Sequence, residues 1–198
     1  MSTYHKGGVL ILDFGSQYTQ LIARRVREHK VYSEILPPET TLEDILTRSP
    51  SALILSGGPS SVFGDEAPDF DQAILNTSIP ILGICYGLQL LAHHHGGLVE
   101  STGSGEYGSA EIQIDSHDGL FTGASNCSQV WMSHMDRVTQ LPNGWHTLAH
   151  SSNGVIAAMA NSDQSRVATQ FHPEVVHTEE GDLFLKNFLF NIAGCDPT

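Results

Sequence analysis

This 198-residue sequence has no long apolar run and no paired-cysteine pattern. No stretch approaches the roughly 18 apolar residues of a membrane span, and Met1-Ser2-Thr3-Tyr4-His5-Lys6 lacks the apolar core of a signal peptide. The three cysteines, Cys85, Cys127 and Cys195, are odd in number and far apart, which argues against a disulfide framework and a cysteine zinc site. We therefore expect a cytoplasmic protein with reduced thiols.

Basic residues are also scarce. Nine Lys and Arg residues face 22 Asp and Glu residues, and a formal net charge of −13 opposes binding to nucleic-acid phosphates. The one short basic cluster, Arg24-Arg25-Val26-Arg27, is typical of a solvated helix face or a docking patch. A nucleotide phosphate loop is disfavoured, because the Gly-x-x-x-x-Gly-Lys pattern is absent and no lysine occurs between Lys30 and Lys186. We expect no nucleic-acid partner and no membrane partner.

Apolar runs of strand length alternate with helix-like segments in the first half of the chain. This alternation predicts an α/β fold with a mostly parallel central sheet and helices on both faces. The expected strands are 9–13, 31–36, 52–55 and 79–82, and the expected helices are 17–29, with Ser16 as N-cap, 41–48 and one that follows residue 85.

Shorter β-like runs from residue 96 onward predict antiparallel edge strands, with loops at 103–105 and 118–127 and a final helix at 179–193. The length fits one domain spanning residues 1–198.

Cys85 lies between glycines where an apolar run passes into a helical segment. The motif Gly83-Ile84-Cys85-Tyr86-Gly87 predicts a tight, strained turn that lifts the cysteine side chain above the sheet. The start of the following helix would favour the thiolate over the thiol. A lone cysteine at a strand end is more often a small buried hydrophobe, so Cys85 becomes a candidate nucleophile only with support from elsewhere in the chain.

That support comes from two other strand ends. In Phe171-His172-Pro173-Glu174 the proline forces an extended conformation, which places the His172 imidazole and the Glu174 carboxylate on the same side. The turn Ser56-Gly57-Gly58-Pro59 offers backbone N–H groups to a developing negative oxygen. Loops at the carboxyl ends of parallel strands meet at one edge of the sheet. The pattern therefore indicates acyl transfer by a Cys-His-Glu triad.

With these motifs in place, the sequence resembles the class I, triad-type glutamine amidotransferases along nearly its whole length. The motifs around Cys85, Gly57 and His172 are shared across that family. The segments Asp13-Phe14-Gly15-Ser16-Gln17-Tyr18 and Trp131-Met132-Ser133-His134 are closer to the glutaminase domains of GMP synthetases. The resemblance implies a flavodoxin-like core and hydrolysis of glutamine to glutamate and ammonia.

The resemblance also implies roles for individual residues. Cys85 would attack the side-chain amide of glutamine, and His172, oriented by Glu174, would protonate the departing ammonia. Two further groups would bind the substrate: the backbone N–H groups of Gly58 and Tyr86 would hold the tetrahedral oxygen, and Gly57, Gln89, Ser133, His134 and Asp136 would bind the rest of glutamine.

Ammonia would then pass to an ATP-pyrophosphatase or synthetase domain or subunit, which makes GMP from xanthosine monophosphate. No cofactor or metal is expected in this domain, whereas ATP and Mg²⁺ are expected on the synthetase half. The sequence carries no Ser-Gly-Gly-x-Asp-Ser nucleotide loop, so the ATP-using half is expected to be a separate subunit or a part of a longer protein.

Two positions depart from the family pattern. Met135 stands where the family has glycine in Ser-His-Gly-Asp, and Gly105 stands where an arginine precedes Glu106-Tyr107-Gly108. Other functions of the same fold stay open: a glutaminase for another synthetase, such as anthranilate or carbamoyl phosphate, a γ-glutamyl hydrolase, or a silent regulatory domain. The intact triad residues argue against the last of these.

Overall fold

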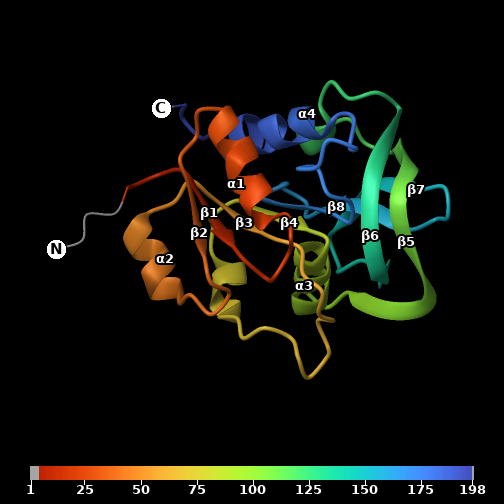
Figure 1. Ribbon diagram of the computed structural model, residues 1–198, viewed down its shortest axis with the longest axis horizontal. Helices are drawn as coiled ribbons and strands as arrows, with labels where there is room; N and C mark the ends of the chain where they lie inside the picture. Colours follow the sequence, from red (N-terminus) through yellow and green to blue (C-terminus); the bar gives the residue numbers. More distant parts are fainter. Residues whose placement is uncertain (1–4, 198) are drawn as a thin grey trace.

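The computed structural model describes residues 5–197, and a single mixed β-sheet forms its centre (Figure 1). Residues 1–4, where a signal peptide was not expected, and residue 198 lie outside the described part. The nine strands of the described chain are β1 (Val9–Leu12), β2 (Ser33–Leu36), β3 (Ala52–Leu55), β4 (Ile81–Ile84), β5 (Leu98–Ile114), β6 (Cys127–Gln140), β7 (His146–Ser151), β8 (Ile156–Ala160) and β9 (Arg166–Thr169).

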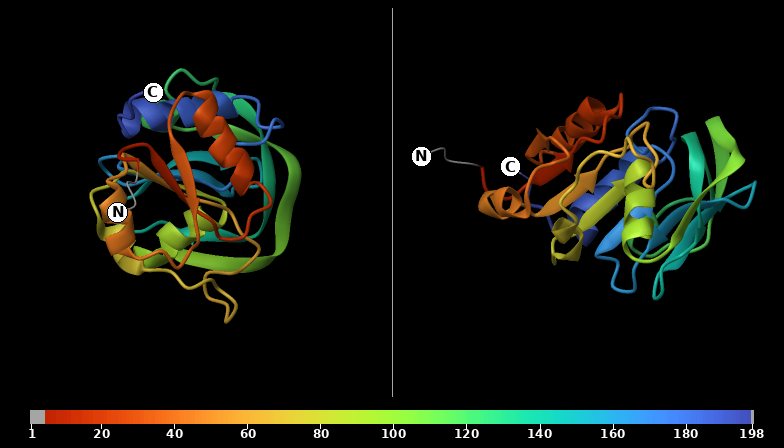
Figure 2. Two further views of the ribbon diagram at one scale, coloured as in Figure 1. Left: turned by 60° about the vertical axis from the view of Figure 1, so that its left-hand side comes forward. Right: turned by 90° about the horizontal axis from the view of Figure 1, so that it is seen from below.

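The strand order is β2-β1-β3-β4-β9-β8-β7-β5-β6. The five strands from β2 to β9 run parallel, and the pairs from β9 to β6 are antiparallel. The antiparallel strands β5 and β6 form the end of the sheet far from α2 (Leu42–Arg48), as Figures 1 and 2 show. The predicted α/β class, with a parallel centre and antiparallel edge strands, is confirmed.

Helices cover both faces of the sheet. Besides α2, they are α1 (Thr19–Glu28), α3 (Tyr86–His94), α4 (Gly181–Lys186), the 3₁₀ turns η1 (Gln72–Asn76) and η2 (Gly119–Phe121), and the π-helical η3 (Asn187–Ile192). Figure 1 shows α1 and α4 close together on one side of the sheet. Among the described residues, no helix combines the length and apolar character that crossing a membrane requires.

The alternation of side chains along β1 explains the two layers. Val9 and Ile11 pack against α1, α4 and η3 in one core, whereas Leu10 and Leu12 pack against α2, α3 and η1 in the other. A strand buried on both faces needs a continuous apolar run, and all four residues of β1 are buried. This burial fixes the central strands and therefore the positions of the loops that follow them.

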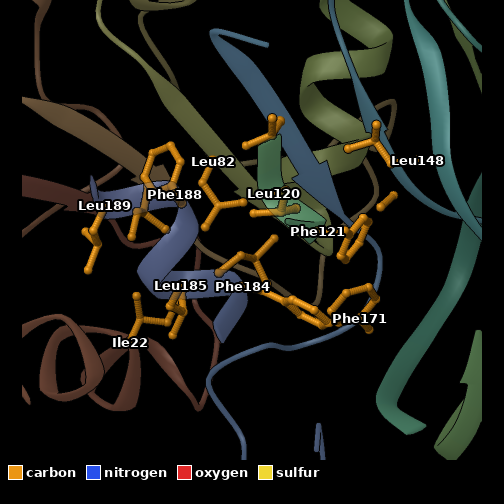
Figure 3. Packing of buried hydrophobic residues seen from close by; sticks show 14 of the residues in the cluster. Ile22, Leu82, Leu120, Phe121, Leu148, Phe171, Phe184, Leu185, Phe188 and Leu189 are labelled. Carbon is orange, nitrogen blue, oxygen red and sulfur yellow. The ribbon is translucent and has the colours of Figure 1, made fainter. Parts of the chain in front are cut away.

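An aromatic cluster anchors the segment that follows β9 (Figure 3). The Phe184 ring of α4 lies 4.8 Å from the Phe121 ring and 5.8 Å from the Phe171 ring, measured between centroids. All three side chains are buried, and burial of such a ring contributes about 1.5–3 kcal/mol. The expected loop at 118–127 therefore contains a core contact, because Leu120 and Phe121 of η2 are inside.

Three local expectations were wrong. The stretch 103–105 continues β5 instead of forming a loop, because the ladder with β6 absorbs it as a register shift between Ser101 and Glu106. The run at 167–171 was expected among the outer or antiparallel strands, but β9 pairs in parallel with β4 inside the sheet. The expected final helix is present as α4 continued by η3. Ser16 does not cap α1, which begins at Thr19; its Oγ accepts the Tyr18 N–H in the turn before the helix.

Candidate active site

The carboxyl ends of β3, β4 and β9 meet at one edge of the sheet. These strands are parallel neighbours, and Ile84 at the end of β4 pairs with Thr169 at the end of β9. Cys85 follows β4 directly, and His172 comes three residues after β9. Cys85 and His172 line one pocket, and a Cβ added at Gly57 would lie 3.1 Å from His172 Cε1 and 3.5 Å from Cys85 Cβ. The structure therefore brings together two residues that lie 87 positions apart in the sequence.

Cys85 occupies a strained turn between β4 and α3. Its backbone has φ 54° and ψ −102°, a combination that a residue with a Cβ rarely adopts and that costs about 1–3 kcal/mol. Its N–H donates to the Thr169 carbonyl over 2.7 Å, and its side chain is largely buried. The turn packs tightly on β3, because a Cβ added at Gly87 would lie only 2.4 Å from the Leu55 carbonyl oxygen. This geometry raises the sulfur over the strand end.

His172 is fixed from both sides. Its Nδ1 lies 2.6 Å from Glu174 Oε1, and both side chains are buried. Its backbone is held by the N–H bond to the Trp131 carbonyl and by Thr178 Oγ1, which donates to the His172 carbonyl over 2.6 Å. The imidazole is therefore held with Nδ1 toward Glu174, and Cys85 is close enough to affect its charge.

The charge balance around His172 favours its protonated form. Burial opposes protonation, but the Glu174 carboxylate and the hydrogen bond to Cys85 outweigh it and raise the pKa of His172 to about 10. Arg25 supports the carboxylate segment from α1, because its Nε donates to the Glu174 backbone carbonyl over 3.0 Å. A cationic imidazole beside a thiol stabilises the thiolate form of the sulfur.

A pocket of about 560 Å³ opens beside the Cys85 sulfur. Four segments that are far apart in the sequence line it: residues 15–18, 58–61, 133–136 and the pair Cys85 and Gln89 on the α3 side, together with Tyr107 and His172. The volume lies within the range of small-molecule pockets, about 300–1,000 Å³.

Seven of the ten predicted site residues line this pocket, namely Gly58, Cys85, Gln89, Ser133, His134, Asp136 and His172. The other three adjoin it. Gly57 packs against Cys85 and His172, because a Cβ added at Gly57 would lie 3.1 Å from His172 Cε1 and 3.5 Å from Cys85 Cβ. Tyr86 begins α3, where backbone N–H groups lack intrahelical partners, and Glu174 lies behind His172.

Side chains of the site also bind the backbone of the segment 133–136. Gln89 Nε2 donates to the Asp136 carbonyl over 3.0 Å, and His134 Nδ1 lies 2.8 Å from the same oxygen. The Ser133 carbonyl accepts the Cys85 thiol over 3.5 Å. The strand segment 133–136 is therefore fixed to both the elbow helix and the sulfur.

Sequence reasoning missed two residues that contact this set. Gln170 Nε2 lies 3.6 Å from the Cys85 sulfur, while Gln170 Oε1 accepts from Gln89 over 3.3 Å. The alternation that placed Glu174 with His172 applies equally to Gln170, two residues before the histidine. Glu106 is the second missed residue, and its Oε1 lies 3.0 Å from His134 Nε2. No pattern in the sequence reveals that pairing, which depends on the register of β5 and β6.

The two departures from the family pattern, Met135 and Gly105, both lie at the side of the pocket that the segment 133–136 forms. We call this side the wall. Met135 lines the pocket and is 44% exposed, so its side chain stands at the mouth. Gly105 packs under the wall, because a Cβ there would lie 2.2 Å from the His134 carbonyl oxygen. Any larger residue at position 105 would force the backbone into a different path. The observed path of the backbone at the wall therefore depends on glycine at this position.

Within residues 5–197, no cluster of three or more His, Cys, Asp or Glu side chains is arranged to hold a metal ion. The chemistry available is that of a strained cysteine, a cationic histidine and a buried glutamate beside a polar pocket. An α/β sheet with a cysteine elbow and this His-Glu pair is the arrangement of a domain built for nucleophilic catalysis by cysteine.

Comparison with known proteins identifies the family. Residues 10–192 match the class-I glutamine amidotransferases, and the chain belongs to that family. It is 51% identical over 197 residues to the glutamine-hydrolyzing GMP synthase of Wolinella succinogenes, covering 98% of this chain and 38% of that protein. The corresponding enzyme of Nostoc punctiforme is 49% identical over 190 residues, covering 96% and 35%. The chain thus spans well under half the length of these relatives.

Solved structures agree in fold. A Thermoplasma acidophilum protein, provisionally described as one subunit of a GMP synthase, superposes with a TM-score of 0.82 at 28% identity and covers 97% of this chain and 96% of that one. A Thermotoga maritima glutamine amidotransferase gives a TM-score of 0.73 at 20% identity, with coverage of 96% and 99%, and supports the fold alone.

Proposed function

We propose that this chain hydrolyses glutamine to glutamate and ammonia and supplies the ammonia to a GMP-forming synthetase. The observation that carries the proposal is the position of Cys85 beside a His172 imidazole that Glu174 holds at 2.6 Å, with both residues at the edge of a pocket of about 560 Å³. Family membership and the similarity to glutamine-hydrolyzing GMP synthases support it further.

In the first half of the reaction, the Cys85 thiolate attacks the carbonyl carbon of the glutamine side-chain amide. The tetrahedral oxygen gains negative charge, and the backbone N–H groups of Gly58 and Tyr86 stabilise it as an oxyanion hole. His172 then gives its proton to the amide nitrogen, the C–N bond breaks, and ammonia leaves. A glutamyl thioester remains on Cys85.

In the second half, water replaces the cysteine. The neutral His172 accepts a proton from the attacking water, and the tetrahedral intermediate expels the Cys85 thiolate as glutamate forms. Glu174 keeps the imidazole in one orientation and stabilises its cationic form in both halves. The active state is thereby restored with no net change in protons on the enzyme.

The rest of glutamine binds at the wall formed by residues 133–136 and Gln89 in this proposal. Gly57, Ser133, His134 and Asp136 shape that side of the pocket, and its polar lining suits an α-amino group and an α-carboxylate. Met135 stands at the mouth, where it narrows the entry for larger γ-glutamyl compounds.

The partner is an ATP-pyrophosphatase, or synthetase, domain or subunit that adenylates xanthosine monophosphate and receives the ammonia. The relatives that match this chain are longer proteins of which it spans 38% or less, which supports such a partner. ATP and Mg²⁺ belong to that partner in our proposal, because thioester chemistry at Cys85 requires neither. A cytoplasmic location is consistent with three free cysteines.

A glutamine-mimicking diazo-ketone tests whether the Cys85 sulfur is the nucleophile. Mass spectrometry after exposure should find the adduct on Cys85, with free glutamine protecting it. Cys127 provides an internal control, because its thiol is exposed whereas Cys85 is only 5% exposed. A reagent that reacts without recognition would modify Cys127 first. Modification of Cys127 in preference to Cys85, or no protection by glutamine, would refute glutamine binding at this site.

Ammonia release tests the coupling. We expect slow release by the chain alone and faster release when an ATP-pyrophosphatase partner with ATP and xanthosine monophosphate is added. Equal rates with and without the partner would contradict the coupling while leaving the hydrolysis itself intact.

A further inference from the structure

A continuous set of polar contacts joins the outer loop after β7 to the Cys85 sulfur. Asn153 Nδ2 donates to Glu106 Oε2 over 3.2 Å, and Glu106 Oε1 contacts His134 Nε2 over 3.0 Å. His134 and Gln89 share the Asp136 carbonyl, Gln89 reaches Gln170, and Gln170 reaches the sulfur. Glu106 therefore connects to the site although it does not line the pocket.

The two ring nitrogens of His134 both face acceptors. A backbone carbonyl has no hydrogen to give, so Nδ1 must donate to the Asp136 oxygen. The other nitrogen, Nε2, lies 3.0 Å from Glu106 Oε1, so the carboxylate of Glu106 holds the ring from the opposite side.

The pair is built into the wall of the pocket. Glu106 and His134 are directly opposite each other in the β5–β6 ladder, and their side chains are only 10% and 2% exposed. Since both ring nitrogens are occupied, the imidazole has no free nitrogen for a ligand. Its effect on a ligand must pass through the backbone of residues 133–136, which it holds at the Asp136 carbonyl.

We propose that Glu106 and His134 are positioning residues that hold the segment 133–136 in the conformation that binds the α-amino and α-carboxylate groups of the substrate. This inference rests on the proposed glutaminase function and names residues that set substrate affinity. Loss of Glu106 lowers affinity more than it lowers the reactivity of the cysteine. Glu106 reaches the sulfur only through several intervening side chains, whereas Glu174 holds His172 directly.

The test compares Glu106→Ala with Glu106→Gln and with Glu111→Ala. The glutamine amide can donate to a neutral His134 and accept from Asn153, so it preserves both contacts without the charge. Glu111 lies on the same strand with an exposed side chain, and its removal changes net charge equally. For each protein, inactivation by the diazo-ketone gives a half-saturating concentration and a limiting rate, and iodoacetamide gives the reactivity of Cys85 without amino-acid recognition.

We expect Glu106→Ala to raise the half-saturating concentration by about 10- to 100-fold, as loss of a charge-assisted hydrogen bond predicts. The limiting rate and the iodoacetamide rate should change less than about twofold. Glu106→Gln and Glu111→Ala should stay within about threefold of wild type. Equal affinity in Glu106→Ala and wild type, or parallel loss of affinity, limiting rate and iodoacetamide reactivity, would overturn the proposal.

Amide hydrogen exchange gives a readout that needs no substrate. Peptides covering residues 131–137 should exchange faster in Glu106→Ala than in Glu111→Ala, and unchanged exchange would overturn the positioning role. If Glu106→Ala does not fold, Glu106→Asp replaces it, because it keeps the charge and shortens the reach; wild-type affinity in that variant would also overturn the proposal. A wild-type protein that the diazo-ketone never modifies at Cys85 would instead refute the glutaminase function.

Discussion

The substitution Glu174→Gln separates the charge of the buried carboxylate from its hydrogen bond. The amide oxygen can still accept from His172 Nδ1, now 2.6 Å from Glu174 Oε1, but the negative charge is gone. In the wild-type protein burial opposes protonation of His172, and Glu174 with Cys85 outweighs it, raising the pKa from 6.5 to about 10. Without the carboxylate, burial dominates and the pKa should fall to its ordinary value or below.

The magnitude follows from proton linkage. At about 1.4 kcal/mol for each tenfold change in proton affinity, a rise of the pKa from 6.5 to about 10 corresponds to about 5 kcal/mol. The folded protein holds this proton more tightly than the unfolded chain. The stabilisation is therefore complete below about pH 6.5 and is lost as the pH rises through about 10. The free energy of unfolding of the wild type should fall across this window, whereas that of Glu174→Gln should lack this decrease.

Urea unfolding followed by tryptophan fluorescence at pH 6, 7, 8 and 9 measures the difference between the two proteins. Burial also raises the pKa of the Cys195 thiol from 9.0 to about 11, which weakens both proteins equally at high pH and cancels in the difference. We expect the stability advantage of the wild type over Glu174→Gln to shrink by more than 1 kcal/mol between pH 6 and 9. Parallel curves over the whole range would refute the assignment of a protonated His172.

Three other variants test the strain and packing around the site. Cys85→Gly should be more stable than Cys85→Ala by about 1–2 kcal/mol in thermal unfolding, because glycine relieves the strain at φ 54° and alanine does not; equal stability would show an unstrained elbow. Gly105→Ala should lose about 2 kcal/mol and raise the half-saturating concentration of the diazo-ketone, because its Cβ meets the His134 carbonyl. Gly64→Ala, where the nearest atom is 3.5 Å away, should be neutral in both measurements. Phe171→Ala should cost about 3–5 kcal/mol in urea unfolding, and a loss below about 1 kcal/mol would contradict its place in the aromatic cluster.

The meeting of Cys85 and His172 was predictable because it depends on a general property of parallel sheets. Apolar runs indicated strands before Cys85 and before His172, although the second was expected among the outer or antiparallel strands. It is β9, which pairs in parallel with β4, and the residues after parallel strands emerge at the same edge of a sheet. Neither apolar run by itself predicts that the two strands are neighbours in the sheet. That prediction came from recognising a glycine-flanked cysteine and a His-x-Glu sequence as parts of one catalytic site, and the structure places the two strands side by side.

The long strand β5 shows where such reasoning fails. Gly103 and Gly105 suggested a loop, since glycine disfavours a strand interior. In the structure Gly105 is needed for the close approach of the His134 carbonyl, and the ladder continues past it with a shift of register. A local propensity cannot reveal a contact with a partner 29 residues away. The same limit hid Glu106, whose role exists only through its opposite residue on β6.

Two features of the site lower the stability of the folded protein and also serve the proposed reaction. Cys85 is held in a strained backbone conformation, and Glu174 Oε2 is buried without a hydrogen-bond partner among the described residues. Several hydrogen-bond donors around a carboxylate would share its negative charge. In Glu174 the only side-chain hydrogen bond found among the described residues is with His172, so the carboxylate acts mainly on that imidazole. The raised pKa of His172 then depends on an incompletely satisfied Glu174, and the strained turn places the Cys85 sulfur next to this imidazole. Cys85→Gly, which relieves the strain of the turn, should therefore be more stable than Cys85→Ala and should have no glutaminase activity.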